Sequence, residues 1–260
     1  NPHVTVTQSS SSFGDIDAGQ AALCLTPYEF VVDDFAPPGE TVDFVLSISD
    51  GARYANADTF SVVLGPIPIL LVDDDAGEST QDWFEESLDR LGYLHETWCE
   101  DTQGTPPLNQ LERYSAIIWD CGWGGNPGSD DRNVLQSYLD GGGTILFSGE
   151  DIGWALNHDG DPDKIQFYND YLHADYVEDD SGYRSLDGVP GDPIGNGLSF
   201  TLNGGDSAMN QFYPSEIEPL SGATGIFEYG PGLEGALRYS TGHREVYLAF
   251  GFEGVTGAAA

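Results

Sequence analysis

Residues 69–77 read Ile-Leu-Leu-Val-Asp-Asp-Asp-Ala-Gly, a run of four apolar residues that ends in three carboxylates and a glycine. Apolar side chains then recur at helical spacing until Gly92, at Trp83, Phe84, Leu88 and Leu91. A continuous apolar strand followed by an amphipathic helix is typical of a parallel sheet that is covered on both faces. The stretch therefore predicts an α/β fold.

The same alternation continues along the chain. Further strands are expected at residues 93–98, 116–119 and 144–147, with helices at 108–114 and 131–139. A helix or helix and turn at 167–176 and an insertion at 182–205 precede late strands at 223–229, 236–239 and 245–250. We predict a flavodoxin-like, doubly wound parallel sheet with helices on both faces. Its first strand, residues 69–72, is expected between the second and third strands.

The N-terminal part has a different pattern. Short alternating or β-branched runs occur at residues 3–7, 28–32, 41–48 and 59–64, separated by Gly, Pro, Asp and Ser, which predicts antiparallel strands. Residues 30–50 resemble the C-terminal half of the immunoglobulin-like modules of secreted bacterial proteins. A complete sandwich of that type needs about seven strands in roughly 100 residues. The resemblance therefore implies a partial β-sandwich whose missing strands lie upstream or in another chain.

The two parts meet at Gly65-Pro-Ile-Pro68, where each proline fixes its own φ and restricts the residue before it. We predict two domains, an immunoglobulin-like domain at residues 1–66 and an α/β domain at residues 67–260. The chain begins within what reads as a strand, and we interpret it as a piece of a larger protein.

The chain is strongly acidic. Eight Lys and Arg against 44 Asp and Glu give a net charge of −36, which repels nucleic acid and anionic membrane surfaces. No apolar run approaches the roughly 20 residues of a membrane helix. The same charge favours cations and basic surfaces, and Lys164 is the single lysine. This composition predicts an extracellular or cell-surface protein whose partners are other protein chains or copies of itself.

Carboxylates follow several of the predicted strands. The carboxyl ends of parallel strands are where open α/β sheets bind ligands. Oxygen ligands of this kind suit a hard divalent cation such as calcium. The candidate metal ligands at this edge are Asp73, Asp75 and Asp120. Glu150, Trp123 and Trp154 also follow strand ends, and we expect them to line a ligand cleft.

A second candidate calcium site lies in the sequence Asn157-His-Asp-Gly-Asp-Pro-Asp-Lys164. Asp159, Asp161 and Asp163 have the opening ligand spacing of an EF-hand loop. Lys164 stands at the sixth position, where that loop has glycine, and Asp170 stands at the twelfth, where it has glutamate. The alternative is a solvated, Asp-rich turn.

Residues 145–153, Ile-Leu-Phe-Ser-Gly-Glu-Asp-Ile-Gly, resemble the nucleophile turn of the class I glutamine amidotransferase-like superfamily. Asp151 stands where that family has its cysteine. Residues 246–253, Val-Tyr-Leu-Ala-Phe-Gly-Phe-Glu, resemble the stretch with the family's histidine and glutamate, but Gly251 and Phe252 occupy the histidine region. The resemblance implies a non-catalytic relative, since both the nucleophile and the base are replaced.

An enzymatic alternative stays open at this point. The three cysteines, Cys24, Cys99 and Cys121, fit no zinc-binding spacing, but Cys121 lies in a glycine-rich segment after a predicted strand. It would act as a nucleophile if His158 or His173 came within hydrogen-bond reach. We therefore predict a non-catalytic extracellular structural or interaction module that assembles by strand addition, with no required cofactor apart from calcium. The alternative is a secreted hydrolase or peptidase-associated domain that uses Cys121, Asp151 or a metal at the acidic strand ends.

Overall fold

The computed structural model describes residues 1–260 except 18, 34, 38, 51–52 and 257–260. The chain divides into two compact units, Asn1–Pro66 and Ile67–Ala260, and each is described by itself. None of the helices within the described residues combines the length and the apolar character needed to cross a lipid bilayer.

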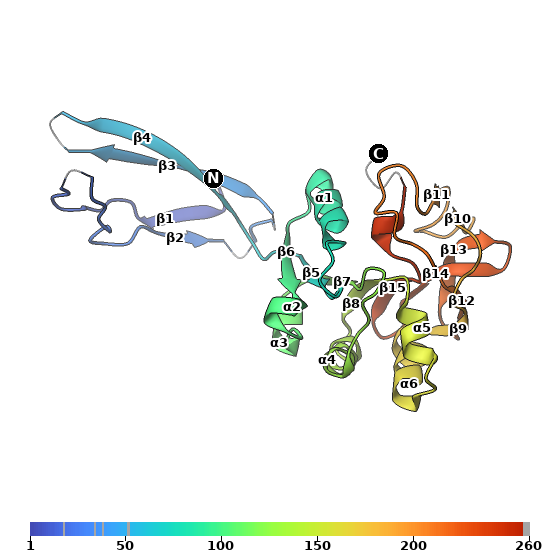
Figure 1. Cartoon of the computed structure of the whole chain (residues 1–260). Coiled ribbons are helices and arrows are strands. Elements are labelled where there is room, and N and C mark those ends of the chain that lie inside the picture. The colour runs from blue at the N-terminus through green and yellow to red at the C-terminus, as the bar shows by residue number, and fades with distance from the viewer. Residues whose placement is uncertain (18, 34, 38, 51–52, 257–260) are drawn as a thin grey trace. The chain divides into compact units, whose positions relative to one another are not determined.

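The described residues of the N-terminal unit form four strands. Strand β1 (Val4–Gln8) pairs antiparallel with β2 (Glu29–Val32), and β3 (Thr41–Ser49) pairs antiparallel with β4 (Ala55–Val63). These are the four strands predicted from the sequence, and their antiparallel pairing is confirmed. They form two separate two-stranded sheets, which can be followed in Figure 1.

Aromatic residues connect the two sheets of the N-terminal unit. The ring of Phe30 on β2 lies 4.9 Å from that of Phe44 on β3, and Phe44 stacks on Phe60 of β4 at 5.5 Å. Among the described residues of this unit, Val42 and Leu64 are the only buried apolar side chains. Two layers of two strands are too few to enclose a core. The predicted partial immunoglobulin-like sandwich, whose segment includes the undescribed residues 34 and 38, is therefore not confirmed.

The larger unit contains the predicted parallel sheet. Strands β5 (Ile69–Asp73), β6 (His95–Cys99), β7 (Ala116–Asp120), β8 (Thr144–Ser148) and β15 (Arg244–Leu248) are parallel neighbours. Their spatial order is β6-β5-β7-β8-β15, which is the 2-1-3-4-5 order of flavodoxin-like sheets. The prediction that the first strand lies between the second and third is confirmed.

The remaining strands change the sheet from parallel to mixed. Strands β14 (Leu233–Tyr239), β13 (Thr224–Gly230), β10 (Ser185–Gly188) and β11 (Ser199–Thr201) extend it antiparallel beyond β15, and β12 (Glu216–Pro219) pairs with β14 and β9 (Ala174–Glu178). The predicted doubly wound parallel sheet is therefore one part of a mixed sheet. Pro231 and Gly232 alone connect β13 to β14, and a two-residue connection can join only antiparallel strands.

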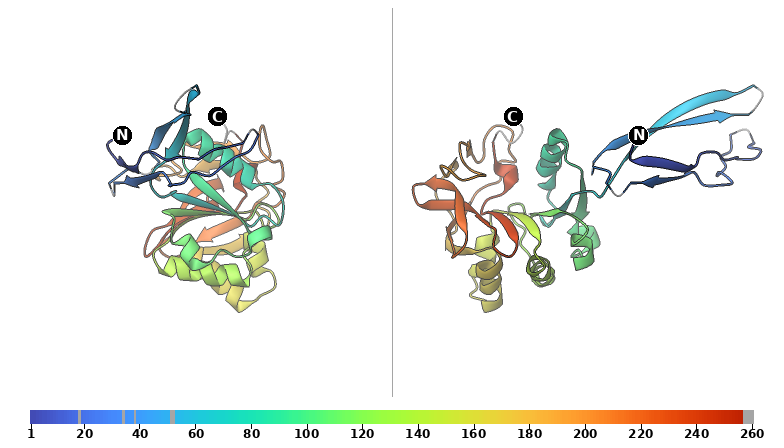
Figure 2. Two further views of the ribbon diagram at one scale, coloured as in Figure 1. Left: turned by 90° about the vertical axis from the view of Figure 1, so that its left-hand side faces the viewer. Right: turned by 180° about the vertical axis from the view of Figure 1, so that it is seen from behind.

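Helices cover both faces of the sheet. They are α1 (Gln81–Leu91), α2 (Glu100–Gln103), α3 (Leu108–Leu111), α4 (Ser129–Asp140), α5 (Ile152–Asn157) and α6 (Pro162–Tyr171), followed by the 3₁₀ turn η1 (Phe252–Gly254). In Figures 1 and 2, α1 lies on one face, and α4, α5 and α6 lie on the other. The core between them includes the fully buried Trp119, Phe147 and Leu135. This packed core holds the parallel strands, and with them the residues at their carboxyl ends, in fixed positions.

Candidate functional site

The carboxyl ends of β5, β7 and β8 meet at one edge of the sheet, as the sequence predicts for parallel strands. The backbone amide of Asp74 donates to the carbonyl of Asp120 at 2.8 Å, and the amide of Cys121 donates to the carbonyl of Ser148 at 2.8 Å. The amide of Glu150 donates to the carbonyl of Gly122 at 3.0 Å. The chain order reverses between β5 and β7, which is the switch point where such sheets bind ligands.

Three carboxylates from different elements converge at this switch point. Asp74 follows β5, Glu100 follows β6 and begins α2, and Asp131 lies in the first turn of α4. One oxygen of each lies within 4.8 Å of the others. Glu100 Oε1 is buried and has no hydrogen-bond partner among the described residues. We call Asp74, Glu100 and Asp131 the acidic triad.

Burial and mutual repulsion raise the pKa values within the acidic triad. Burial, followed by the charges of Asp74 and Asp131, raises the pKa of Glu100 to about 9. Burial also raises the pKa of Asp74 to about 7, although the Trp119 indole opposes this by donating to Asp74 Oδ2 at 3.0 Å. Such groups hold protons near neutral pH unless a cation replaces those protons. The triad therefore offers oxygen ligands that a divalent cation would stabilise.

None of the three triad residues was among the metal ligands predicted from the sequence, although Asp74 lies between the candidates Asp73 and Asp75. Glu100 directly follows a strand that the sequence located, so it could have been selected on the same grounds as Asp73. Asp131 lies eleven positions after the end of β7 at Asp120, within a helix, so strand ends alone could not indicate it. Its Oδ2 accepts the amide of Gly128 at 2.7 Å, which positions the carboxylate as a helix cap.

The predicted ligands Asp75 and Asp120 are engaged in local structure. Asp75 accepts the amides of Gly77, Glu78 and Thr80 at 3.0, 2.8 and 2.9 Å and so shapes the turn before α1. Asp120 accepts the amide of Gly122 at 3.0 Å and the Thr80 hydroxyl at 2.8 Å. Asp73 is also buried, and this raises its pKa to about 6. Within the described residues, the carboxylates that converge as a ligand set are those of the acidic triad.

The EF-hand-like segment forms a helix cap. Asp159 accepts the amide of Asp161 at 3.0 Å and pairs with Lys164 Nζ at 2.6 Å. Asp161 in turn accepts the amide of Asp163 at 3.0 Å as the N-cap of α6. The carboxylates serve the turn and the helix start, as in the alternative interpretation of an Asp-rich turn.

The candidate nucleophiles lie in surroundings that oppose nucleophilic chemistry. Cys121 is fully buried, its thiol donates to Asp74 Oδ2 at 3.6 Å, and burial together with nearby carboxylates raises its pKa well above the usual value. Asp151 forms the predicted turn between β8 and α5, and burial followed by the charge of Asp179 raises its pKa to about 6. A thiol held protonated is a weak nucleophile.

The two candidate bases are engaged elsewhere. His158 stacks on Trp154 with ring centroids 3.8 Å apart, and its Nδ1 lies 2.9 Å from the Trp154 carbonyl. His173 Nδ1 lies 3.0 Å from Glu245 Oε2. Neither contact involves Cys121 or Asp151.

The residues predicted to line a ligand cleft have mixed environments. Trp123 is 40% exposed and meets Phe212 edge to face at 6.2 Å, while Trp154 is 43% exposed. Glu150 is fully buried, its Oε1 accepts the amide of Tyr213, and burial raises its pKa to about 8. Exposed aromatic rings therefore lie beside the strand ends. Glu150 is not part of that exposed surface, because it is buried and binds the backbone of Tyr213.

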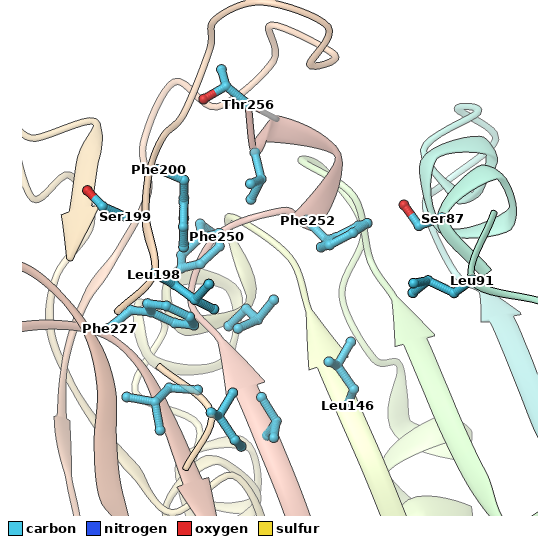
Figure 3. Close-up of a pocket in the computed structure, with 15 residues that line it drawn as sticks. Ser87, Leu91, Leu146, Leu198, Ser199, Phe200, Phe227, Phe250, Phe252 and Thr256 are labelled. Atoms are coloured by element: carbon cyan, nitrogen blue, oxygen red, sulfur yellow. The ribbon is translucent and has the colours of Figure 1, made fainter. Parts of the chain in front are cut away.

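An apolar pocket of about 440 Å³ opens on the face of the sheet that α1 occupies. Figure 3 shows side chains from the sheet, η1 and α1 around it, among them Leu146, Phe250, Phe252 and Leu91. Leu91 is 71% exposed at the rim, whereas Phe84 and Leu88 of α1 are buried. Besides α1, the 3₁₀ turn η1 lies on this face, and its Phe252 lines the pocket (Figure 3).

No family model and no curated protein matches the chain. Among solved structures, it is similar to a candidate GMP synthase subunit from Thermoplasma acidophilum. The two proteins share 16% sequence identity with a TM-score of 0.48, over 75% of this chain and 90% of that chain. At this level of similarity, only the residues of this chain bear on its function.

Proposed function

We propose that the chain is a non-catalytic, extracellular interaction module that assembles with copies of itself through strands of its N-terminal unit. We also propose that the acidic triad binds a calcium ion. The extracellular setting is supported by composition, since one lysine and 44 acidic residues suit a saline or calcium-rich exterior.

The incomplete N-terminal unit supports assembly most directly. Phe60 is 51% exposed and Phe30 is 39% exposed, although both rings belong to the face between the two sheets. Each of the four strands also has one edge without a strand partner among the described residues. Unpaired edges beside an apolar face invite strand addition from another chain. A second copy would both pair these edges and cover the aromatic rings.

The surroundings of Cys121 and Asp151 support the absence of catalysis. A buried thiol that donates to a carboxylate lacks the electropositive environment that generates a thiolate. The histidines offered by the sequence have other partners, Trp154 and Glu245. The turn after β8 thus keeps the position of a nucleophile without the groups that would activate one.

Calcium binding is favoured by a specific observation, the unpartnered Glu100 Oε1 between two other carboxylates. Calcium takes 6–8 oxygen ligands, so the triad would supply part of the shell and water the rest. Mutual repulsion among the triad is relieved when a cation binds, which gives the ion a stabilising role in the α/β unit.

Association of the intact chain is expected to increase with salt. Each copy has a net charge of −36, so repulsion opposes contact until salt reduces the Debye length to about 3 Å near 1 M. Sedimentation velocity of the full chain should show monomers at low salt and larger species at high salt. Phe60→Thr should lower this association roughly tenfold, because it removes exposed aromatic area from the face to be covered.

Tyr183→Thr is the matched control, since Tyr183 is 52% exposed in the other unit. It should associate like the wild type. Far-ultraviolet circular dichroism at low salt checks that Phe60→Thr stays folded. A wild-type chain that remains monomeric at every salt concentration and with calcium would refute the assembly proposal.

Cys121 is expected to be the slowest thiol to react. Cys24 and Cys99 are partly exposed, whereas Cys121 is fully buried and its pKa is raised. A thiol-specific reagent should label two cysteines of the native chain at least tenfold faster than the third, and mass spectrometry should place the slow site at Cys121. Rapid labelling at Cys121, or an amidase or esterase activity lost in Cys121→Ser or Asp151→Ala, would favour the hydrolase alternative.

A further inference from the structure

A cluster of two histidines and a glutamate lies at the amino end of β15, at the opposite end of the parallel strands from the acidic triad. His243 immediately precedes β15 and Glu245 is its second residue. His173 lies between α6 and β9. The cluster therefore joins β15, a parallel strand of the sheet, to the segment between α6 and β9.

The three side chains converge on one point. His173 Nδ1 lies 3.0 Å from Glu245 Oε2, and His243 Nε2 lies 3.6 Å from the same oxygen. One ligand atom of each residue lies within 4.8 Å of the others. His173 and His243 are each 9% exposed and Glu245 is 2% exposed, so the cluster is buried but open at its margin.

Two polar atoms of the cluster lack a hydrogen bond in the described part of the chain. His243 Nε2 and Glu245 Oε1 are buried and make no hydrogen bond within the described residues. Leaving buried polar atoms unpaired is costly, so such atoms indicate a missing ligand. The backbone φ of His173, 47°, lies in the left-handed region, which histidine adopts more readily than most residues.

The ring of His173 is fixed in place. It stacks on Tyr239 with ring centroids 3.5 Å apart, and Tyr239 also lies 5.0 Å from His243. The backbone carbonyl of His173 accepts the amide of Leu220 at 2.8 Å. Both contacts hold the imidazole at the cluster before any ligand arrives, as a preorganised metal site requires.

We propose that His173, His243 and Glu245 bind a zinc ion. Zn–N and Zn–O bonds of about 2.0–2.1 Å in tetrahedral geometry place ligand atoms roughly 3.3 Å apart, close to the distances in this cluster. Two imidazoles and one carboxylate are a ligand set that suits zinc, whereas calcium prefers oxygen ligands alone. Water or an incoming group would supply the fourth ligand. The site lies outside the proposed assembly surface and the acidic triad.

Zinc binding is tested on the intact chain after metal removal by a chelator. Titration against a competing zinc indicator should show one tight site for each chain, and zinc should raise the unfolding temperature. Glu245→Gln and His173→Asn should each weaken binding at least about tenfold. Asparagine tolerates left-handed backbone, so His173→Asn keeps the fold testable if Glu245→Gln does not fold. Cobalt should give the intense visible absorption of a tetrahedral ion in the wild type, but not in Glu245→Gln or His173→Asn.

His158→Asn is the matched control, since it removes a histidine that lies on Trp154 outside the cluster. Glu100→Gln tests whether zinc instead binds the acidic triad. Both variants should bind zinc like the wild type. The proposal is overturned if the wild type binds no zinc tightly, if His173→Asn and Glu245→Gln bind it as tightly as the wild type, or if Glu100→Gln abolishes binding.

Discussion

Asp74→Asn is expected to stabilise the protein at pH 8 when divalent cations are chelated, and to make it less stable than the wild type when calcium is abundant. Burial raises the pKa of Asp74 to about 7, so its ionised form at pH 8 destabilises the folded state. Asparagine removes that charge. Its amide oxygen still accepts from the Trp119 indole, which donates to Asp74 Oδ2 at 3.0 Å.

The effect should depend on pH in a defined direction. A carboxylate whose pKa is raised on folding binds more protons in the folded state, so stability falls as pH rises from the unfolded value of about 4 through the folded value of about 7. The advantage of Asp74→Asn should therefore be absent near pH 4 and complete by pH 8. About three pH units correspond to roughly 4 kcal/mol, which solvent screening reduces to about 2 kcal/mol.

Calcium should reverse the order of stability. A ligand that binds the folded state stabilises it by an amount that grows with the logarithm of its concentration over its dissociation constant. The wild type has three carboxylates for the ion and the variant has two, so calcium should stabilise the wild type more. Urea unfolding between pH 4 and 8, with chelator and with millimolar calcium, measures both effects.

Asp159→Asn is the control for this experiment. Asp159 is exposed and pairs with Lys164, so its replacement should change stability little and leave the response to calcium intact. If Asp159→Asn removes the calcium response and Asp74→Asn does not, the EF-hand-like segment binds the ion. A wild type that calcium does not stabilise contradicts the acidic triad as a cation site.

The parallel part of the sheet could be predicted because its strands are continuous apolar runs. Leu70, Leu71 and Val72 are fully or almost fully buried, so burial on both faces requires an unbroken apolar pattern in the sequence. The helix after them ends at Gly92, whose φ of 74° explains the glycine at that stop. The apolar pattern of the sequence therefore predicts the fold correctly for elements that are as deeply buried as this strand.

The antiparallel extension could be predicted only in part. Strands β13 and β14 match those expected at residues 223–229 and 236–239, whereas β10 and β11 were not predicted. Strands β10 and β11 have four and three residues, too few for an alternating pattern to stand out. They lie in a segment whose Gly, Pro and Asp content indicates turns. Gly188 shows why this composition is needed, since a Cβ there would lie 1.7 Å from the carbonyl oxygen of Gly195. Close backbone approach requires glycine here, and glycine masks the strand pattern.

The candidate sites could likewise be predicted only in part. Strand ends could be located from the sequence, and the structure does bring Asp74, Asp120 and Glu150 to one edge. The direction of each side chain decides whether a carboxylate caps a turn, as Asp75 does, or joins a cluster of ligands, as Asp74 does, and the sequence does not show that direction. The cluster of His173, His243 and Glu245 joins residues as far as 72 positions apart, so no local spacing revealed it.

Gly125→Ala is expected to destabilise the α/β unit by roughly 3 kcal/mol, at the upper end of the usual cost of overpacking. A Cβ on Gly125 would lie 2.1 Å from the backbone oxygen of Asp74 and 2.5 Å from that of Cys121. Neither oxygen can move freely, because the Gly125 amide donates to the Cys121 carbonyl at 2.8 Å and the Asp74 amide is bound to Asp120. The loop after β7 would have to shift away from the loop after β5.

Gly124→Ala separates this clash from the general effect of replacing a glycine. A Cβ on Gly124 would meet no atom within 4 Å, so its cost should stay within about 0.5 kcal/mol. Because Asp74 is part of the acidic triad, Gly125→Ala should also weaken the stabilisation by calcium, and Gly124→Ala should not. Urea unfolding of both variants with and without calcium gives the two readouts together. Equal stability of the two variants would show that the loops after β5 and β7 are not in rigid contact, and the acidic triad would then lose the fixed base on which its proposed cation site depends.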